Sequence, residues 1–364
     1  MNSKKILVLN NYSLKRVTEE IRLNVKPSHH LYGIMEMKSE GIIFDYLETD
    51  TTHFLFKLGK WMRKIPLFYL GDLYIQVKAL KQQNNYDVIY APCQDCTIFL
   101  GLLRYFKILR TPLVAIAHHP ILSGRLISVR RLTSYFFLKG HSFFPALSNV
   151  VATQINSIVG KELSAELHWG PNLAFYEKEL SLQEKTLSKD IDIVAIGRTG
   201  RDYDTLIRAF DGTNIRVAIY CHESCKNSLL TKFTNNISIH FLQNPEELNY
   251  KRIIQIYSNS KILAIPMLPQ DSLCGLTSVV DGIAMGMPII ATYNKYINID
   301  IEKLRIGYWV KPYDENEWRQ KTMSLLNNAD LIKSMSDNAL RVGKEKININ
   351  LFTDEIKKLL VFAV

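Results

Sequence analysis

The sequence predicts an α/β protein built from two doubly wound, Rossmann-like domains. Short runs rich in β-branched residues alternate with longer segments of helical period along the whole chain. Most of these runs are almost continuously apolar, which is typical of parallel strands that are buried on both faces. The length of 364 residues is enough for two domains of ordinary size.

In the first half of the chain, six short apolar runs are predicted as strands. They are Lys5–Asn10, Ile42–Leu47, Asp87–Ala91, Pro112–Ala117, Phe143–Leu147 and Glu166–Trp169. Each is followed by a turn or a helix-period segment, as a βαβ repeat requires.

The second half repeats the pattern. Its predicted strands are Ile191–Ile196, Arg216–Cys221, Ile237–Phe241, Lys261–Pro266, Pro288–Thr292 and Gly307–Val310. Between them, helical period is clearest over Asp202–Phe210, Pro245–Ser258 and Ser278–Met285.

The least regular stretch, Gly170–Asp190, is the natural linker between the two halves. We therefore predict an N-terminal domain over residues 1–172, a C-terminal domain over 173–345, and a terminal helix over 346–364 that packs back toward the N-terminal domain. Open α/β sheets bind ligands at the carboxyl ends of their strands. Two such domains facing each other across a cleft suit an enzyme that joins two substrates.

Composition excludes several classes of protein. Hydrophobic residues make up 47% and charged residues 22%, which describes a folded globular chain. No uninterrupted apolar run approaches the ~20 residues of a spanning helix, and the first ten residues read as a strand, not as a signal peptide. The five cysteines are sparse and odd in number, which favours a reducing cytoplasm. A four-thiolate metal site from Cys93, Cys96, Cys221 and Cys225 is the weaker alternative to buried thiols, because no His stands at ligand spacing.

Two segments of the second half carry chemistry. The first is a strand that runs into Gly197-Arg198-Thr-Gly-Arg201 and then into an amphipathic helix. Glycine lets a ligand approach the backbone, and the two arginines can neutralise a diphosphate. For this segment alone, ordinary surface arginines at a helix start are the simpler interpretation.

The second segment begins with a turn at Gly275 and a helix start near Leu276, Thr277 and Ser278. The free backbone N–H groups of such a start can bind a phosphate. Asp281 follows about one helical turn later, within reach of ribose hydroxyls, although its apolar neighbours mean that a buried carboxylate there needs a partner.

Taken together, these two segments resemble the GT-B glycosyltransferases, in particular family 4, whose bacterial members build cell-surface glycans. The resemblance implies that Gly197, Arg198 and Arg201 hold the donor diphosphate. It also implies that Asp281 binds the nucleotide ribose. Residues 283–292, with Ala284-Met-Gly286-Met-Pro288, match the end of the family's hallmark motif.

One residue of that motif is missing. The family carries a first acid eight residues before the second, where this chain has Leu273. Either Asp271 reaches the site from a shifted loop, or the contact with the sugar ring has been lost. The remaining motif implies a metal-independent reaction that retains anomeric configuration, with the nucleotide diphosphate sugar as substrate and no cofactor.

In the first half, the strand that ends at His118-His119-Pro120 resembles the family's strand ending in a His beside the transferred sugar. A lone His after a strand is more often structural, but the strand end and the family match favour a catalytic His118. The resemblance implies that its imidazole hydrogen-bonds to, or polarises, the reacting centre.

The positive charge is concentrated in one quarter of the chain. The net charge is +10, and residues 51–140 alone carry 13 Lys and Arg against three acids. Cations alternate with large apolar side chains over residues 54–64, 104–110 and 125–139, a pattern of segments that bind anionic bilayers. Ordinary solvated helix faces are the alternative, whereas no recognisable module supports nucleic-acid binding.

The sequence thus predicts a cytoplasmic glycosyltransferase, peripheral on the inner face of the plasma membrane, that moves a sugar to a glycan or lipid-linked acceptor. Two alternatives remain open: a non-catalytic GT-B-like partner of another glycosyltransferase, and a GT-B sugar-nucleotide epimerase.

Overall fold

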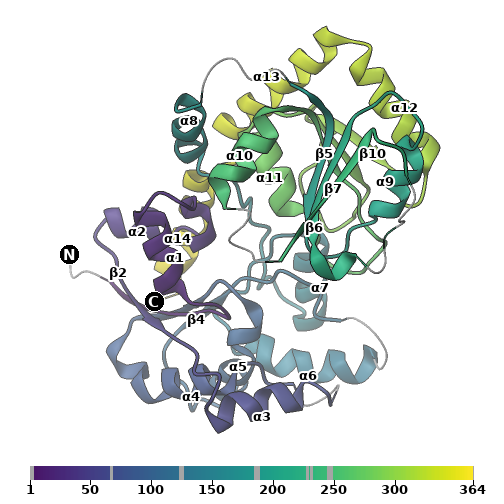
Figure 1. The fold of residues 1–364 in the computed structure, drawn as a ribbon. Coiled ribbons are helices and arrows are strands. Elements are labelled where there is room, and N and C mark those ends of the chain that lie inside the picture. Colours follow the sequence, from purple (N-terminus) through teal and green to yellow (C-terminus); the bar gives the residue numbers. More distant parts are fainter. Residues whose placement is uncertain are drawn as a thin grey trace. The chain divides into compact units, whose positions relative to one another are not determined.

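The computed structural model describes residues 4–65, 69–122, 127–183, 189–226, 229, 233–243 and 249–363. The chain divides into two compact units (Figure 1). The first comprises Met1–Leu23, Ser28–Trp169 and Ile349–Val364, and the second comprises Asn24–Pro27 and Gly170–Asn348. Arg125 of the predicted basic segment and residues 245–248 of a predicted helix lie outside the described residues.

The first unit contains a parallel sheet in the order β2-β1-β3-β4. Its strands are β1 (Lys5–Leu9), β2 (Ile43–Leu47), β3 (Val88–Ala91) and β4 (Leu113–Ala115). The central strands are buried on both faces, which explains their continuous apolar sequence. The α-helices of this unit are α1 (Leu14–Arg22), α2 (Ile34–Ser39), α3 (Phe54–Met62), α4 (Leu73–Gln82), α5 (Ile98–Tyr105), α6 (Ile127–Lys139), α7 (Asn149–Val159) and α14 (Ile349–Phe362).

Two predicted strands of this unit are not regular strands. Residues 143–147 and 166–169 continue the sheet beyond β4 only through isolated parallel bridges, Val114 to Phe143, Ala117 to Ala146 and Ala146 to Glu166. Pro145 interrupts the ladder because it has no N–H group to donate, although its carbonyl accepts from Ala117 N at 2.8 Å.

The second unit contains a parallel sheet in the order β10-β9-β8-β5-β6-β7. Its strands are β5 (Ile191–Gly197), β6 (Val217–His222), β7 (Ile237–Leu242), β8 (Ser260–Ile265), β9 (Ile289–Thr292) and β10 (Gly307–Val310). Helices α8 (Leu173–Ser181), α9 (Tyr203–Phe210), α10 (Tyr250–Ser258), α11 (Leu276–Ala284), α12 (Glu315–Leu326) and α13 (Ala329–Glu345) surround it. The prediction of two doubly wound α/β domains is confirmed.

The helices of the second unit cover both faces of its sheet. On one face, α9 and α12 pack against β5, β6 and β9, with Trp318 only 1% exposed. On the other, α8 packs on α10 through Phe175, Tyr176 and Tyr250. Short polar side chains fix the helix starts by accepting hydrogen bonds from backbone N–H groups, as Asp202 does for α9 and Asp314 does for α12.

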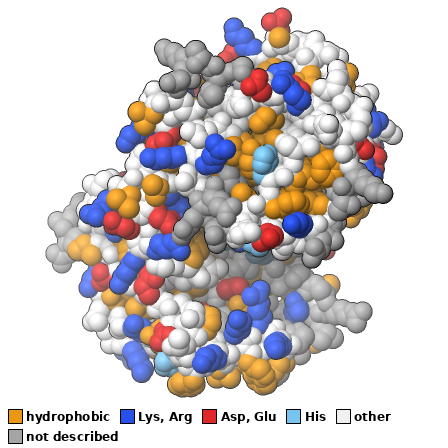
Figure 2. Space-filling view, viewed as in Figure 1, with side chains coloured by type: hydrophobic (Ala, Val, Ile, Leu, Met, Phe, Trp, Pro, Cys, Tyr) orange, Lys and Arg blue, Asp and Glu red, His pale blue; other side chains and the backbone are white. Residues whose placement is uncertain are grey.

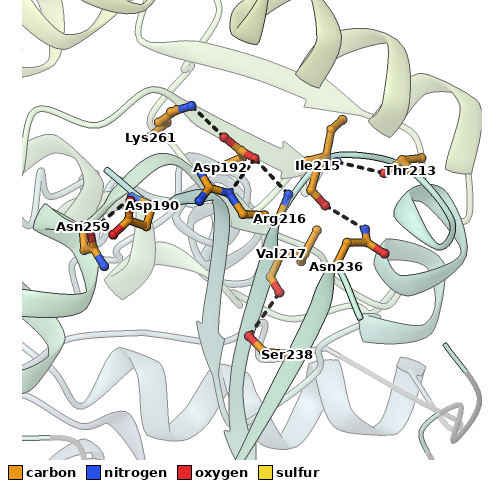
Figure 3. A network of polar contacts seen from close by, with 10 residues as sticks. All are labelled: Asp190, Asp192, Thr213, Ile215, Arg216, Val217, Asn236, Ser238, Asn259 and Lys261. Atoms are coloured by element: carbon orange, nitrogen blue, oxygen red, sulfur yellow. Dashed lines mark hydrogen bonds and ion pairs between the residues drawn. The ribbon is translucent and has the colours of Figure 1, made fainter. Parts of the chain in front are cut away.

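A polar network closes the amino-terminal edge of this sheet (Figure 3). Asp192, at the start of β5, accepts from Lys261 Nζ at 2.7 Å and from the Arg216 amide at 2.9 Å. Burial on its own would raise the pKa of Asp192, but these bonds and the two cations outweigh it and hold that pKa below its usual value. Polar side chains at this edge tie strands together, so the ligand site has to be sought at the opposite edge.

Candidate functional site

The strand order of the second unit defines the edge at which doubly wound folds bind ligands. From β5 the chain builds outward through β6 and β7, then returns to β8 on the other side of β5 and continues through β9 to β10. The loops after β5 and β8 therefore diverge at the carboxyl ends of adjacent strands, which is the crevice that doubly wound folds use for nucleotides. Gly197 to Arg201 follow β5, and Gly275 to Asp281 follow β8 and its loop.

Arg201 lies across the turn that follows β5. Its Nη2 donates to Ser278 Oγ at 3.1 Å, and its Nη1 donates to the Thr199 carbonyl at 3.2 Å. Its Nε is buried and has no hydrogen-bond partner within the described part of the chain. A Cβ at Gly197 would lie 2.3 Å from this Nε, so glycine is required for the guanidinium to lie there.

The two predicted arginines have different environments. Arg201 is held by the first turn of α11, whereas Arg198 is exposed at the tip of the turn. The structure thus brings Gly197, Arg201 and the start of α11 together, and leaves Arg198 exposed to solvent.

The loops after β5 and β8 are joined by backbone pairing. Arg201 forms an antiparallel bridge with Met267, and the Leu268 amide donates to the Gly200 carbonyl at 3.0 Å. Gly200 has a φ of +63°, a conformation that favours glycine. The turn from Gly197 to Arg201, called the arginine turn below, is therefore anchored on the loop that leads into α11.

Helix α11 begins with an uncapped turn. Gly275, at its N-cap, has a φ of +86° and supplies no side-chain cap. A Cβ at Gly275 would lie 2.6 Å from Met267 Sδ, so the glycine lets the helix start approach the β8 loop. Leu276 is buried and Thr277 is exposed. Backbone N–H groups in a first helical turn lack intrahelical acceptors and carry partial positive charge.

Asp281 has the partner that its apolar surroundings demand. The Tyr176 hydroxyl donates to Asp281 Oδ1 at 2.6 Å, and Asp281 is only 5% exposed. Burial raises the pKa of Asp281 to about 7, although the bond from Tyr176 acts in the opposite direction. The sequence did not single out Tyr176, because α8 lies about 100 residues earlier in the chain.

Asp271, the candidate replacement for the acid missing from the motif, is exposed and pairs with a lysine. The Asp271 side chain is 78% exposed and pairs with Lys295 Nζ at 3.4 Å. The two alternatives that the sequence left open for this acid therefore stay predictions.

His118 belongs to the first unit, at the carboxyl end of β4. Its Nε2 is 2.6 Å from the Pro92 carbonyl, which can only accept, so Nε2 carries the proton and Nδ1 is the acceptor. Burial lowers the pKa of His118 to about 4, against the opposing effect of the Pro92 bond. The imidazole is thus neutral at pH 7. The His118 and His119 amides both donate to Gln94 Oε1, at 2.7 and 2.9 Å.

Gln94 fixes the backbone that carries His118 and His119, and no sequence signal singles it out. It lies between Cys93 and Cys96, two of the four cysteines that the sequence offers as an alternative metal site. Within the described ranges, none of the five cysteines forms a disulfide, and no cluster of three or more His, Cys, Asp or Glu residues has the geometry of a metal site.

Comparison with known proteins identifies the fold. No protein-family model matches the chain, and no curated protein matches it. Among solved structures, Anabaena HepE in complex with UDP aligns over 98% of this chain and 100% of its own, with a TM-score of 0.65 and 15% identity. Sucrose-phosphate synthase from Thermosynechococcus elongatus aligns over 99% of this chain and 100% of its own, with a TM-score of 0.69 and 12% identity. WaaG, a glycosyltransferase involved in lipopolysaccharide biosynthesis, aligns over 97% and 99%, with a TM-score of 0.61 and 12% identity. The chain has the GT-B fold.

Proposed function

We propose that this protein is a glycosyltransferase that moves a sugar from a nucleotide diphosphate sugar to a glycan or lipid-linked acceptor in bacterial cell-surface polysaccharide synthesis. The observation that carries this proposal is Arg201, whose buried Nε lies over Gly197 without a partner within the described residues, at the switch point of the sheet. The UDP named with HepE and the lipopolysaccharide role named for WaaG support the same class of reaction.

The proposed chemistry is stabilisation of a leaving diphosphate. Arg201, Arg198 and the N-terminal amides of α11 place positive charge where negative charge develops as the glycosidic bond breaks. These groups supply that charge without a metal ion, and we propose a retaining transfer with an oxocarbenium-like transition state.

Two further residues have proposed roles, each within its own unit. Asp281 contacts the ribose through Oδ2, since Tyr176 occupies Oδ1. His118 serves the acceptor side, where a neutral imidazole with Nδ1 as acceptor can take a hydrogen bond from a sugar hydroxyl.

We also propose that the first unit binds an anionic membrane surface on the cytoplasmic side. Large apolar side chains of the three basic segments are exposed: Phe54, Leu58, Trp61, Tyr105, Phe106, Ile108, Ile127, Val129 and Leu132. Figure 2 shows orange and blue side chains together at the lower margin, where Figure 1 places α3 to α6. No helix in the described ranges is long and apolar enough to cross a membrane.

Vesicles test the membrane proposal. Liposomes that contain anionic lipid should bind the protein and release it at high salt, and replacing Lys57 and Lys60 by Gln should weaken this binding. Neutral vesicles and a Lys321→Gln variant, which alters a cation of the second unit, are the controls. Binding that is absent or insensitive to salt contradicts the electrostatic proposal.

Donor binding and transfer test the main proposal. In a thermal-shift panel of UDP, GDP, ADP and dTDP, the preferred nucleotide should stabilise the protein most. Arg201→Ala and Arg198→Ala should reduce sugar transfer by orders of magnitude with the fold intact, and unchanged transfer in the double variant contradicts the assignment. The exposed position of Asp271 favours the second candidate, a non-catalytic GT-B-like partner, which would bind nucleotide without turnover. Epimerisation of the sugar nucleotide without acceptor would identify the third candidate.

A further inference from the structure

Gln270 presents a second buried donor beside the arginine turn. It lies in the loop after β8, two residues beyond Leu268, whose amide pairs with the Gly200 carbonyl at 3.0 Å. Its Nε2 is buried and has no hydrogen-bond partner in the part of the chain that the structure describes. A Cβ at Gly200 would lie 2.2 Å from this Nε2, so the amide rests on the glycine itself.

Two donors without acceptors therefore lie on one turn: Arg201 Nε over Gly197 and Gln270 Nε2 over Gly200. Leaving a buried donor unsatisfied is unfavourable, so a ligand that supplies acceptors to this pair would be bound favourably.

The neighbouring carboxylates are engaged elsewhere. Asp271 pairs with Lys295, and Asp202 accepts the Thr205 amide at the start of α9. Asp281 accepts from the Tyr176 hydroxyl. Within the described residues these two donors have no acceptor, and next to a guanidinium an anionic oxygen from a ligand is favoured.

We propose that Gln270 donates through Nε2 to an oxygen of the donor's diphosphate, beside Arg201, and so makes the site select diphosphates over monophosphates. This inference rests on the proposed function. Where the family motif has an acid that accepts from sugar hydroxyls, this chain has Leu273, and the nearby polar group that faces the turn is a donor. The Gln270 Nε2 group cannot accept a hydrogen bond as that carboxylate does, but it can donate to phosphate oxygens.

The test compares paired ligands by isothermal titration calorimetry. UDP, GDP, ADP and dTDP are each measured against the matching monophosphate. Gln270→Met removes the donor at nearly constant side-chain length, Gln270→Glu replaces it by a carboxylate, and Asp271→Asn changes an exposed neighbour in the same loop as the control. Thermal unfolding of each variant without ligand shows whether the fold is intact.

For the nucleotide that the wild type prefers, Gln270→Met should weaken diphosphate binding by about 10-fold or more, the effect of losing a hydrogen bond to a charged group. Binding of the monophosphate should change by less than about 3-fold, and Asp271→Asn should alter neither. Gln270→Glu should weaken the diphosphate further because it adds like charge, and lowering the pH should restore part of that loss.

Equal losses for diphosphate and monophosphate, or no loss for either, overturn the assignment of Gln270. If Arg201→Ala abolishes diphosphate binding while Gln270→Met leaves it intact, the proposed function stands and only this inference fails. If the wild type binds none of the four diphosphates, the proposed function fails and the inference fails with it.

Discussion

Replacing Asp281 by Asn should make the protein more stable at alkaline pH. Burial raises the pKa of the Asp281 carboxyl from 3.8 to about 7. A carboxyl whose pKa is higher in the folded protein than in the unfolded chain contributes its full stabilisation at pH values below the unfolded pKa. This stabilisation is lost as the pH rises from 3.8 to about 7. Above that range the folded protein carries a buried charge that the unfolded chain exposes to water.

The size of the effect follows from the pKa. Because one pKa unit corresponds to 1.36 kcal/mol, the interval from pH 5 to pH 7 costs the wild type about 3 kcal/mol of unfolding free energy. Asn cannot ionise, and its Oδ1 still accepts from the Tyr176 hydroxyl. The stability of Asp281→Asn relative to the wild type should therefore rise by about 3 kcal/mol between pH 5 and pH 8.

Urea unfolding at pH 5, 6, 7 and 8 measures this difference when unfolding is monitored by a spectroscopic probe in the second unit. Shifts in Tm should agree, at about 2–4 °C per kcal/mol for a domain of this size. Tyr176→Phe is the matched control: it removes the bond that lowers the pKa of Asp281, so its stability should go on falling to a higher pH than that of the wild type. Parallel pH profiles for the wild type and Asp281→Asn would refute the reasoning.

Two further predictions concern stability. Asp192→Asn should lower the unfolding free energy by about 1–3 kcal/mol at pH 7, because Lys261 loses its carboxylate partner. The pKa of Asp192 is held below its usual value of 3.8, so this gap should narrow as the pH falls below 3.8 and through the lowered pKa, which a urea-unfolding series from pH 7 downward would show. Gly33→Ala should lower Tm more than Gly41→Ala. Both glycines have φ above +80°, but a Cβ at Gly33 would lie 2.9 Å from Thr353 Oγ1, whereas nothing lies within 4 Å at Gly41. Equal Tm losses would show that backbone strain alone matters.

The sequence predicts the sheets well because buried parallel strands are apolar throughout, and that pattern is local. It does not predict that 143–147 stays irregular, since Pro145 breaks a ladder whose existence depends on distant pairing. Residues 24–27 group with the second unit, where Asn24 Nδ2 donates to Glu179 Oε1 at 2.6 Å. No local pattern could show such a contact.

The same distinction applies to the site. Gly197, Arg201 and Gly275 follow strands in short motifs, and the structure places them at the expected edge. Tyr176, Gln94 and Gln270 were missed because each acts through a residue distant in sequence or through a glycine against which it packs. A glutamine in a loop has no sequence signature, and only its unpartnered amide reveals it.

The central claim is that the carboxyl edge at β5 and β8 binds the donor diphosphate. Amide hydrogen exchange, followed by mass spectrometry with and without the preferred nucleoside diphosphate, tests it directly. The account predicts that the nucleotide protects peptides covering residues 197–202 and 275–281, and that Arg201→Ala removes this protection. Protection confined to the β1 to β4 edge of the first unit, or no protection in either unit despite measured binding, would contradict it.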